Sequence, residues 1–191
     1  MTSRKAKSRR KNPAGKGRRP VVYTIGHSTR SFDELVELLR AHGIERLVDV
    51  RTVPRSRTNP QFNRDTFGPA LRNRRIAYRH MKELGGLRRA RPDSVNTGWR
   101  NASFRGFADY MQTDEFRAAL DELEALAAEK TTAIMCAEAV PWRCHRSLIA
   151  DALIARGHEV RDIMSPTSAK PRTLNPMAKV EGDEITYPGL L

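Results

Sequence analysis

The sequence predicts a single α/β domain with a Rossmann-like, three-layer fold: a mainly parallel sheet of four or five strands, with helices on both faces. Two observations support this prediction. Short β-branched or apolar runs alternate with longer stretches in which apolar residues recur at helical spacing. The length of 191 residues also suits one hydrophobic core, because two domains of half this size would each lack apolar surface.

The first half of the predicted domain contains three strands and two helices. A β-branched run at 21–25 ends at Gly26, and Ser31 with Glu34 three residues later is typical of a capping box at a helix start. This helix ends at Gly43. The remaining elements of this half are a strand at 47–50, a long loop at 51–63, a helix at 64–75 and a strand at 76–80.

The second half begins after a break at Leu84-Gly85-Gly86. Residues 87–103 are predicted to be a polar, mobile insertion. The elements expected after it are two helices within 104–130 divided near Thr113-Asp114, a strand at 132–135, a helix ending at Gly157 and a strand at 159–163. The domain is therefore expected to span 21–165, followed by a C-terminal extension at 166–191 with a small hairpin about Gly182-Asp183.

The net charge of +13 is unevenly distributed, because residues 1–20 carry nine Lys or Arg and no acidic residue. Such a segment is expected to be a disordered basic arm. Flexible Lys and Arg neutralise phosphates without reading base edges, so nonspecific nucleic acid is the partner predicted for residues 1–20.

Neither membrane insertion nor secretion is indicated. No apolar run approaches the roughly 20 residues that cross a bilayer, and no apolar region follows the basic N-terminus. Only Cys136 and Cys144 are present, which is too few for a disulfide scaffold. We therefore expect a cytoplasmic protein whose cysteines serve chemistry or packing.

Ligands of open parallel sheets bind beyond the carboxyl ends of the strands, so the residues that follow each strand are the candidates for a site. They are Gly26, His27 and Ser28 after the first strand, Asp49 and Arg51 after the second, and Cys136, Glu138, Cys144, His145 and Arg146 after the fourth. Since these residues share one edge of the sheet, we expect them to converge on one pocket.

The segment from Cys136 to Arg146 is the densest concentration of reactive side chains. If Cys144 lies in the first turn of a helix, the helix dipole is expected to lower the pKa of its thiol and to favour bound anions. The alternative is that both cysteines are small buried hydrophobic residues, and that Arg146 forms a structural ion pair with Asp49 or Glu138.

The loop after Asp49 carries Arg51, Arg55 and Asn59, and its guanidinium groups suit phosphate or carboxylate ligands. The alternative is a solvated loop. A phosphatase Cys-x5-Arg loop is excluded, since six residues separate Cys136 from Arg143. Cys136-Ala-Glu138 is similar to part of a zinc deaminase signature, but the remaining spacing does not fit, so we predict no metal and no cofactor.

Several motifs in chain order resemble the family catalogued as domain of unknown function 488, over about Tyr23 to Ile163. They are Tyr23-Thr-Ile-Gly-His-Ser28, Asp49-Val-Arg51 with Pro54 and Ser56, Asn59-Pro-Gln-Phe62, Tyr78 with His80, Leu84-Gly-Gly86, Phe104 to Tyr110, and Cys136-Ala-Glu138 through Cys144-His-Arg146. The resemblance implies a Rossmann-like α/β domain whose site is formed by these motif residues. It implies no particular reaction.

The leading hypothesis is a hydrolase or group transferase that acts on a small anionic or nucleotide-like substrate. Glu138 with His27 or His145 would move protons, and Cys144 or Cys136 would be the nucleophile. The residues expected to bind substrate are Gly26, Ser28, Asp49, Arg51, Arg55, Asn59, Tyr78 and Arg146. The alternative hypothesis is a non-catalytic, nucleic-acid-associated module that senses a ligand and uses the basic arm for contact.

Overall fold

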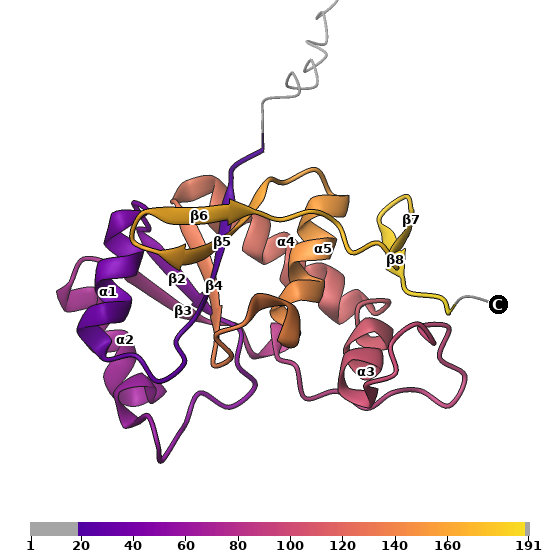
Figure 1. The fold of residues 1–191 in the computed structure, drawn as a ribbon, viewed down its shortest axis with the longest axis horizontal. Helices are drawn as coiled ribbons and strands as arrows, with labels where there is room; N and C mark the ends of the chain where they lie inside the picture. Colours follow the sequence, from indigo (N-terminus) through magenta and orange to yellow (C-terminus); the bar gives the residue numbers. More distant parts are fainter. Residues whose placement is uncertain (1–18, 190–191) are drawn as a thin grey trace, which may run out of the picture.

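The computed structural model describes residues 19–189, and its centre is a six-stranded sheet (Figure 1). The strand order is β3-β2-β4-β1-β5-β6, in which the first five are parallel and β6 runs antiparallel to β5. The strands are β1 (Val22–Gly26), β2 (Arg46–Asp49), β3 (Ala77–His80), β4 (Thr132–Cys136), β5 (Val160–Ser165) and β6 (Ser168–Pro171). The predicted α/β class with a mainly parallel sheet is confirmed.

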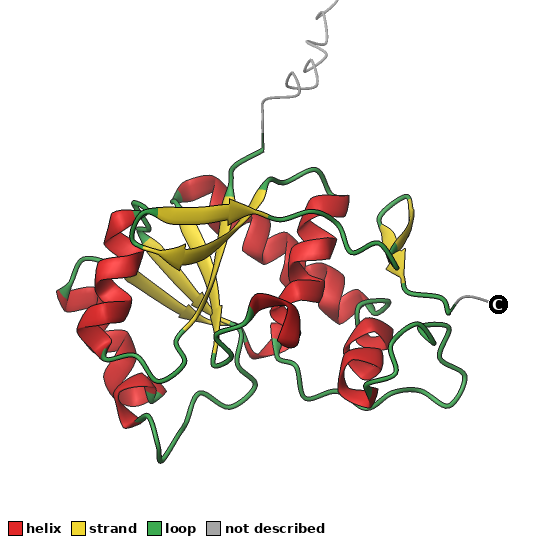
Figure 2. Ribbon diagram, in the orientation of Figure 1, coloured by secondary structure: helices red, strands yellow, loops and turns green. Residues whose placement is uncertain are grey.

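Helices cover both faces of the sheet, which gives the three layers visible in Figure 2. One face carries α1 (Phe32–Ala41) and α2 (Arg64–Asn73), and the other carries α3 (Ala102–Tyr110), α4 (Asp114–Glu129) and α5 (Arg146–Ala155). Three short 3-10 turns complete the helical elements, η1 (Pro60–Phe62), η2 (Lys82–Leu84) and η3 (Pro141–Arg143).

Side-chain alternation along β4 explains how one apolar strand serves two cores. Ala133 and Met135 pack in the cluster under α1 and α2, whereas Ile134 and Cys136 pack in the cluster under α3, α4 and α5. All five residues of β4 are buried, as expected for a central parallel strand.

The capping box predicted for α1 is present. Glu34 N donates to Ser31 Oγ at 3.2 Å, and Ser31 N donates to Glu34 Oε2 at 2.6 Å. The helix ends where Gly43 takes a left-handed φ of 65°.

Of the predicted mobile insertion at 87–103, residues 102–103 begin α3 and residues 87–101 are loop that is hydrogen-bonded to the rest of the domain. The buried carboxylate of Asp109 in α3 accepts hydrogen bonds from Arg91 N, Ser94 Oγ and Asn96 Nδ2. Asn96 Oδ1 in turn accepts from Tyr187 N at 2.8 Å. The expectation of a loosely attached segment is wrong, because Asp109 on a neighbouring helix satisfies the polar groups of the loop.

The predicted C-terminal extension packs into the domain. Residues 168–171 form β6, and the predicted hairpin is present as β7 (Lys179–Glu181) and β8 (Glu184–Thr186), with Gly182 at a φ of 61°. Tyr187 is fully buried, and its hydroxyl donates to Asp151 Oδ2 at 2.9 Å.

Most of the predicted basic arm, 1–18, lies outside the described residues. At its end, Arg19 forms an ion pair of 2.7 Å with Glu124 in α4. Among residues 19–189, no helix is both long enough and apolar enough to cross a membrane.

The strand order places the end of β4 between the ends of β1 and β2. Gly26 pairs in register with Cys136, and Asp49 pairs with Met135. The chain leaves β1 towards α1 on one face and leaves β4 towards α5 on the other, so these neighbouring strands form a topological switch point. Ligand crevices of open α/β sheets form at such points.

Candidate functional site

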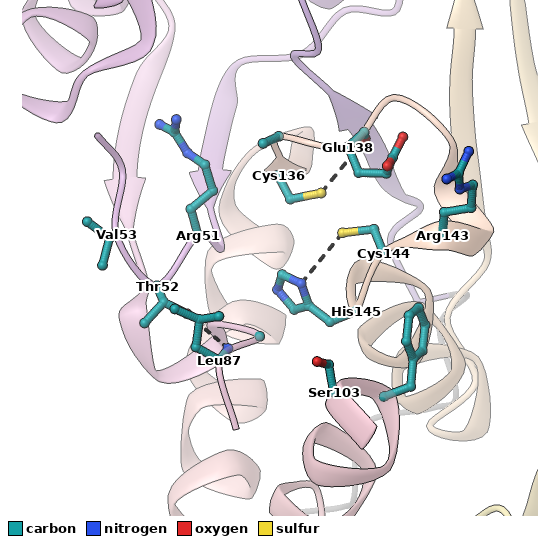
Figure 3. A pocket seen from close by; sticks show the side chains of 13 residues that line it. Arg51, Thr52, Val53, Leu87, Ser103, Cys136, Glu138, Arg143, Cys144 and His145 are labelled. Atoms are coloured by element: carbon teal, nitrogen blue, oxygen red, sulfur yellow. Dashed lines mark hydrogen bonds between the residues drawn. The ribbon is translucent and has the colours of Figure 1, made fainter. Parts of the chain in front are cut away.

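A cavity of about 390 Å³ opens at the carboxyl end of β4, at this switch point (Figure 3). Its walls come from the loop after β2, the segment after η2, the start of α3 and the segment from β4 to α5. The residues that line it are Arg51, Thr52, Val53, Gly86, Leu87, Ser103, Phe104, Cys136, Ala137, Glu138, Arg143, Cys144 and His145.

Cys136 lies deep in this cavity and is 3 % exposed. Arg146 Nη1 donates to Cys136 Sγ at 2.9 Å, and also to the carbonyl oxygens of Ile25 and Glu138. Arg146 is 1 % exposed. Among residues 19–189 it forms no ion pair with a carboxylate, and its Nε and Nη2 atoms have no hydrogen-bond partner. A buried guanidinium needs an anionic partner, and the Cys136 sulfur is the group in contact that can supply one.

The pKa of the Cys136 thiol is lowered to about 7. A hydrogen bond from the Cys144 thiol is the largest cause, and the charge of Arg146 adds to it, whereas burial acts in the opposite direction. These contacts therefore favour the thiolate form of Cys136 over that of Cys144.

Cys144, expected in the first turn of a helix, instead precedes α5, and its contacts favour Cys136 as the more acidic thiol of the pair. The pKa of Cys144 is raised, because its proton is held in the hydrogen bond to Cys136, because it is buried and because a charge on Cys136 repels a second one. Its position next to α5 gives it one weak contact, from Arg146 N at 3.5 Å, which does not offset these effects.

His145 holds a fixed tautomer beside Cys144. Its Nε2–H donates to the Val50 carbonyl at 3.1 Å, which leaves the Nδ1 lone pair 3.5 Å from Cys144 Sγ. Burial lowers the pKa of His145 to about 4, so the ring is neutral at pH 7. Gly86 makes room for this ring, since a Cβ at that position would meet His145 Nδ1 at 2.5 Å.

Arg51 is held by a network at the end of β2. Its Nε and Nη2 atoms donate to the Asp49 carboxylate at 2.9 and 2.6 Å, and Nη2 also donates to the Phe62 carbonyl. Nη1 donates to His27 Nε2 at 3.2 Å. A guanidinium has five N–H groups, so one on Nη1 has no partner among the described residues.

His27 serves this network and has no free nitrogen for proton transfer. Its Nδ1–H donates to the Ser28 carbonyl at 2.8 Å, and its ring stacks on Phe62 with centroids 4.3 Å apart. Burial lowers the pKa of His27 to about 4. The neutral imidazole therefore positions Arg51.

Glu138 provides the carboxylate of the cavity. Its Oε1 accepts from Val140 N at 3.0 Å, and its Oε2 has no hydrogen-bond partner among the described residues. The loop that carries it packs directly over Gly26, where an added Cβ would collide with the Glu138 carbonyl. Gly26 thus makes room for this loop.

Of the thirteen site residues predicted from the sequence, five line the cavity: Arg51, Cys136, Glu138, Cys144 and His145. Five others lie behind the cavity wall and hold these groups, namely Gly26, His27, Asp49, Tyr78 and Arg146. Ser28, Arg55 and Asn59 do not line the cavity. Tyr78 borders a separate hollow beside α2, and its hydroxyl donates to Asp49 Oδ2 at 2.7 Å.

Reasoning from the residues alone missed the apolar wall formed by Val53, Leu87 and Phe104. It placed Arg143 beside Cys144 as a group that stabilises a thiolate, and Arg143 does line the cavity. Within the described part of the chain, no group of three or more His, Cys, Asp and Glu side chains is arranged to hold a metal ion.

The family model described as Domain of unknown function DUF488 matches residues 31–153. The chain belongs to this family. The match includes Arg51, Cys136, Glu138 and Cys144, so the cavity residues lie within the DUF488 domain. No curated protein matches the chain, and no solved structure does.

Proposed function

We propose that this DUF488 protein is a cysteine-dependent hydrolase or group transferase, with Cys136 as its nucleophile, that acts on a small anionic or nucleotide-like substrate. The observation that carries the proposal is the 2.9 Å contact between Cys136 Sγ and Arg146, a buried guanidinium without a carboxylate partner. Thiolates held by a neighbouring cation are the reactive form of catalytic cysteines.

The cavity suits a substrate that combines a negative charge with an apolar body. Arg51 and Arg143 supply positive charge at its wall, and Arg51 is held rigidly by Asp49 and His27. Val53, Leu87 and Phe104 supply the apolar surface. A mostly apolar wall with a small number of polar groups is typical of small-molecule sites.

In the proposed reaction, the Cys136 thiolate attacks the electrophilic carbon or phosphorus atom of the substrate. A bond to sulfur forms, and the leaving group departs with the electron pair of the bond that breaks. A water molecule then attacks the same atom, gives its proton to the Glu138 carboxylate, and returns the electron pair to sulfur. The proton on Glu138 then passes to the leaving group of the first step. In a transferase, an acceptor hydroxyl or amine takes the place of the water molecule.

Cys144 and His145 act through Cys136. The Cys144 thiol can donate to the Cys136 thiolate and stabilise it, and it can turn to His145 Nδ1, 3.5 Å from its sulfur, when Cys136 becomes bonded to substrate. The nucleic-acid-sensing alternative depends on the basic arm, which is mostly outside the described residues, and it stays a prediction.

The test is turnover of chromogenic carboxylate and phosphate esters, compared in the wild type, Cys136→Ser and Glu138→Gln. We expect Cys136→Ser to abolish turnover, and Glu138→Gln to form the covalent intermediate but release it slowly. The matched control is Thr29→Ala, an exposed residue outside the cavity, which should leave turnover unchanged. Turnover that survives Cys136→Ser would rule out the proposal.

A further inference from the structure

Two large hydrophobic side chains that line the cavity are exposed, and a third exposed one precedes a lining residue in the sequence. Val53 is 62 % exposed, Leu87 77 % and Trp142 68 %. Val53 and Leu87 line the cavity on walls that Figure 3 shows next to each other, and Trp142 precedes Arg143 on the opposite wall. Single exposed hydrophobic residues need no explanation, but a group of them around a cavity is typical of a binding surface.

The segments that carry these three side chains also carry arginines whose guanidinium groups have no ion-pair or hydrogen-bond partner among the described residues. Arg55 and Arg57 follow Val53, Arg89 follows Leu87, and Arg143 follows Trp142. All four are exposed.

Free guanidinium groups beside exposed apolar and aromatic side chains match the chemistry of single-stranded nucleic acid. Arginines contact the phosphates, and the flat face of a tryptophan stacks on a base of any identity. A duplex does not fit as well, because its bases are stacked inside the helix and must be flipped out to enter a cavity. Since Cys136 is nearly fully buried, a ligand must place a group inside the cavity to reach it.

We propose that the cavity mouth binds a single-stranded nucleic acid and that one nucleotide of the strand enters the cavity above Cys136. This inference rests on the proposed function and names its substrate class. The contact is distinct from the one predicted for residues 1–20, which would hold a strand or a duplex without closing the cavity.

The test measures the rate at which iodoacetamide alkylates Cys136 in the full-length protein, with and without an oligothymidylate of about eight nucleotides. At a free strand concentration about ten times its dissociation constant, about one tenth of the protein stays unoccupied, so a strand in the cavity should slow alkylation about tenfold. A duplex of the same charge should bind through the basic arm and leave the alkylation rate unchanged. Fluorescence anisotropy of a labelled strand gives the affinity in parallel.

Two variants of the mouth locate the contact. Trp142→Ala should weaken binding roughly tenfold through lost stacking. Arg143→Gln should lower the slope of log affinity against log salt by about 0.7, the value for one phosphate of a single strand. The matched control is Arg75→Gln, an exposed arginine that precedes β3 and so lies at the opposite edge of the sheet, which should change neither quantity.

Two results would overturn the inference and assign strand binding to the arm. One is a strand that saturates the protein without slowing alkylation of Cys136. The other is an equal affinity of the strand for Trp142→Ala and for the wild type. Either result leaves a reactive Cys136 and the proposed function intact. A Cys136 that does not react in the free protein would instead contradict the proposed function, and the Trp142→Ala affinity would still decide whether the mouth binds the strand.

Discussion

The ionisation of Cys136 can be tested by changing the residue that contributes most to it. Cys144→Ala removes the thiol that donates to Cys136 and leaves Cys136 as the only cysteine of the chain. Cys144→Ser also leaves one cysteine, but it keeps a hydroxyl donor at the same position. The two variants therefore differ in one hydrogen bond to the Cys136 sulfur.

A hydrogen bond to a charged group contributes about 1.5 to 3 kcal/mol. At 1.36 kcal/mol for each pH unit, its loss should raise the pKa of Cys136 by about one to two pH units. From the value of about 7 in the intact site, the pKa is expected to reach about 8 to 9 in Cys144→Ala and to stay near 7 in Cys144→Ser. At pH 7 the thiolate fraction would fall from about half to between roughly one tenth and one hundredth.

The assay is the rate of alkylation by iodoacetamide as a function of pH, and its midpoint gives the pKa. The midpoint is more informative than the rate at one pH, because a thiolate of higher pKa is intrinsically more nucleophilic, with a Brønsted coefficient of about 0.4 to 0.5. Equal midpoints in Cys144→Ala and Cys144→Ser, or a wild-type midpoint close to 9, would refute the reasoning.

Further predictions follow from the same contacts. Arg146→Gln in the Cys144→Ser background should raise the alkylation midpoint, because it removes the buried cation next to sulfur; an unchanged midpoint would exclude Arg146 as the thiolate's partner. Asp49→Asn should lower the free energy of unfolding by about 3 to 5 kcal/mol in urea titrations, since it leaves the buried Arg51 without its counter-charge. For Asp151, burial raises the folded-state pKa from 3.8 to about 6, so its ionisation costs about 3 kcal/mol above pH 6 and nothing below about pH 4. As pH rises from 4 to 7, Asp151→Asn should therefore gain stability relative to the wild type, and parallel stability curves would contradict this.

The sequence predicted the five parallel strands of the sheet, including the edge strand β3, but not the antiparallel strand β6 at the other edge. The run at Thr132–Cys136 is apolar because β4 is buried on both faces, so its pattern is visible without the structure. The edge strand Ser168–Pro171 is polar and ends in proline, because it pairs on one side only. No apolar pattern marks such a strand, and it was assigned to the extension.

The sequence predicts that Cys136 and Cys144 lie at one edge of the sheet. It does not show which of the two sulfurs loses its proton. Which sulfur ionises depends on Arg146, which reaches back from α5 to Cys136, and on the direction of the Cys144 S–H bond. Helix-dipole reasoning favoured Cys144 because it considered the local segment alone. The apolar wall was missed because Val53 and Leu87 are exposed loop residues without periodicity.

The central claim, that Cys136 is the reactive nucleophile, is tested most directly by locating the adduct that forms when the wild type meets less than one equivalent of iodoacetamide at pH 7. Trypsin cleaves after Lys130 and Arg143, so Cys136 and Cys144 fall in different peptides that mass spectrometry distinguishes. We predict that the adduct lies on Cys136, in the peptide 131–143. An adduct on Cys144, or native protein that reacts at neither sulfur until it is unfolded, would contradict the claim.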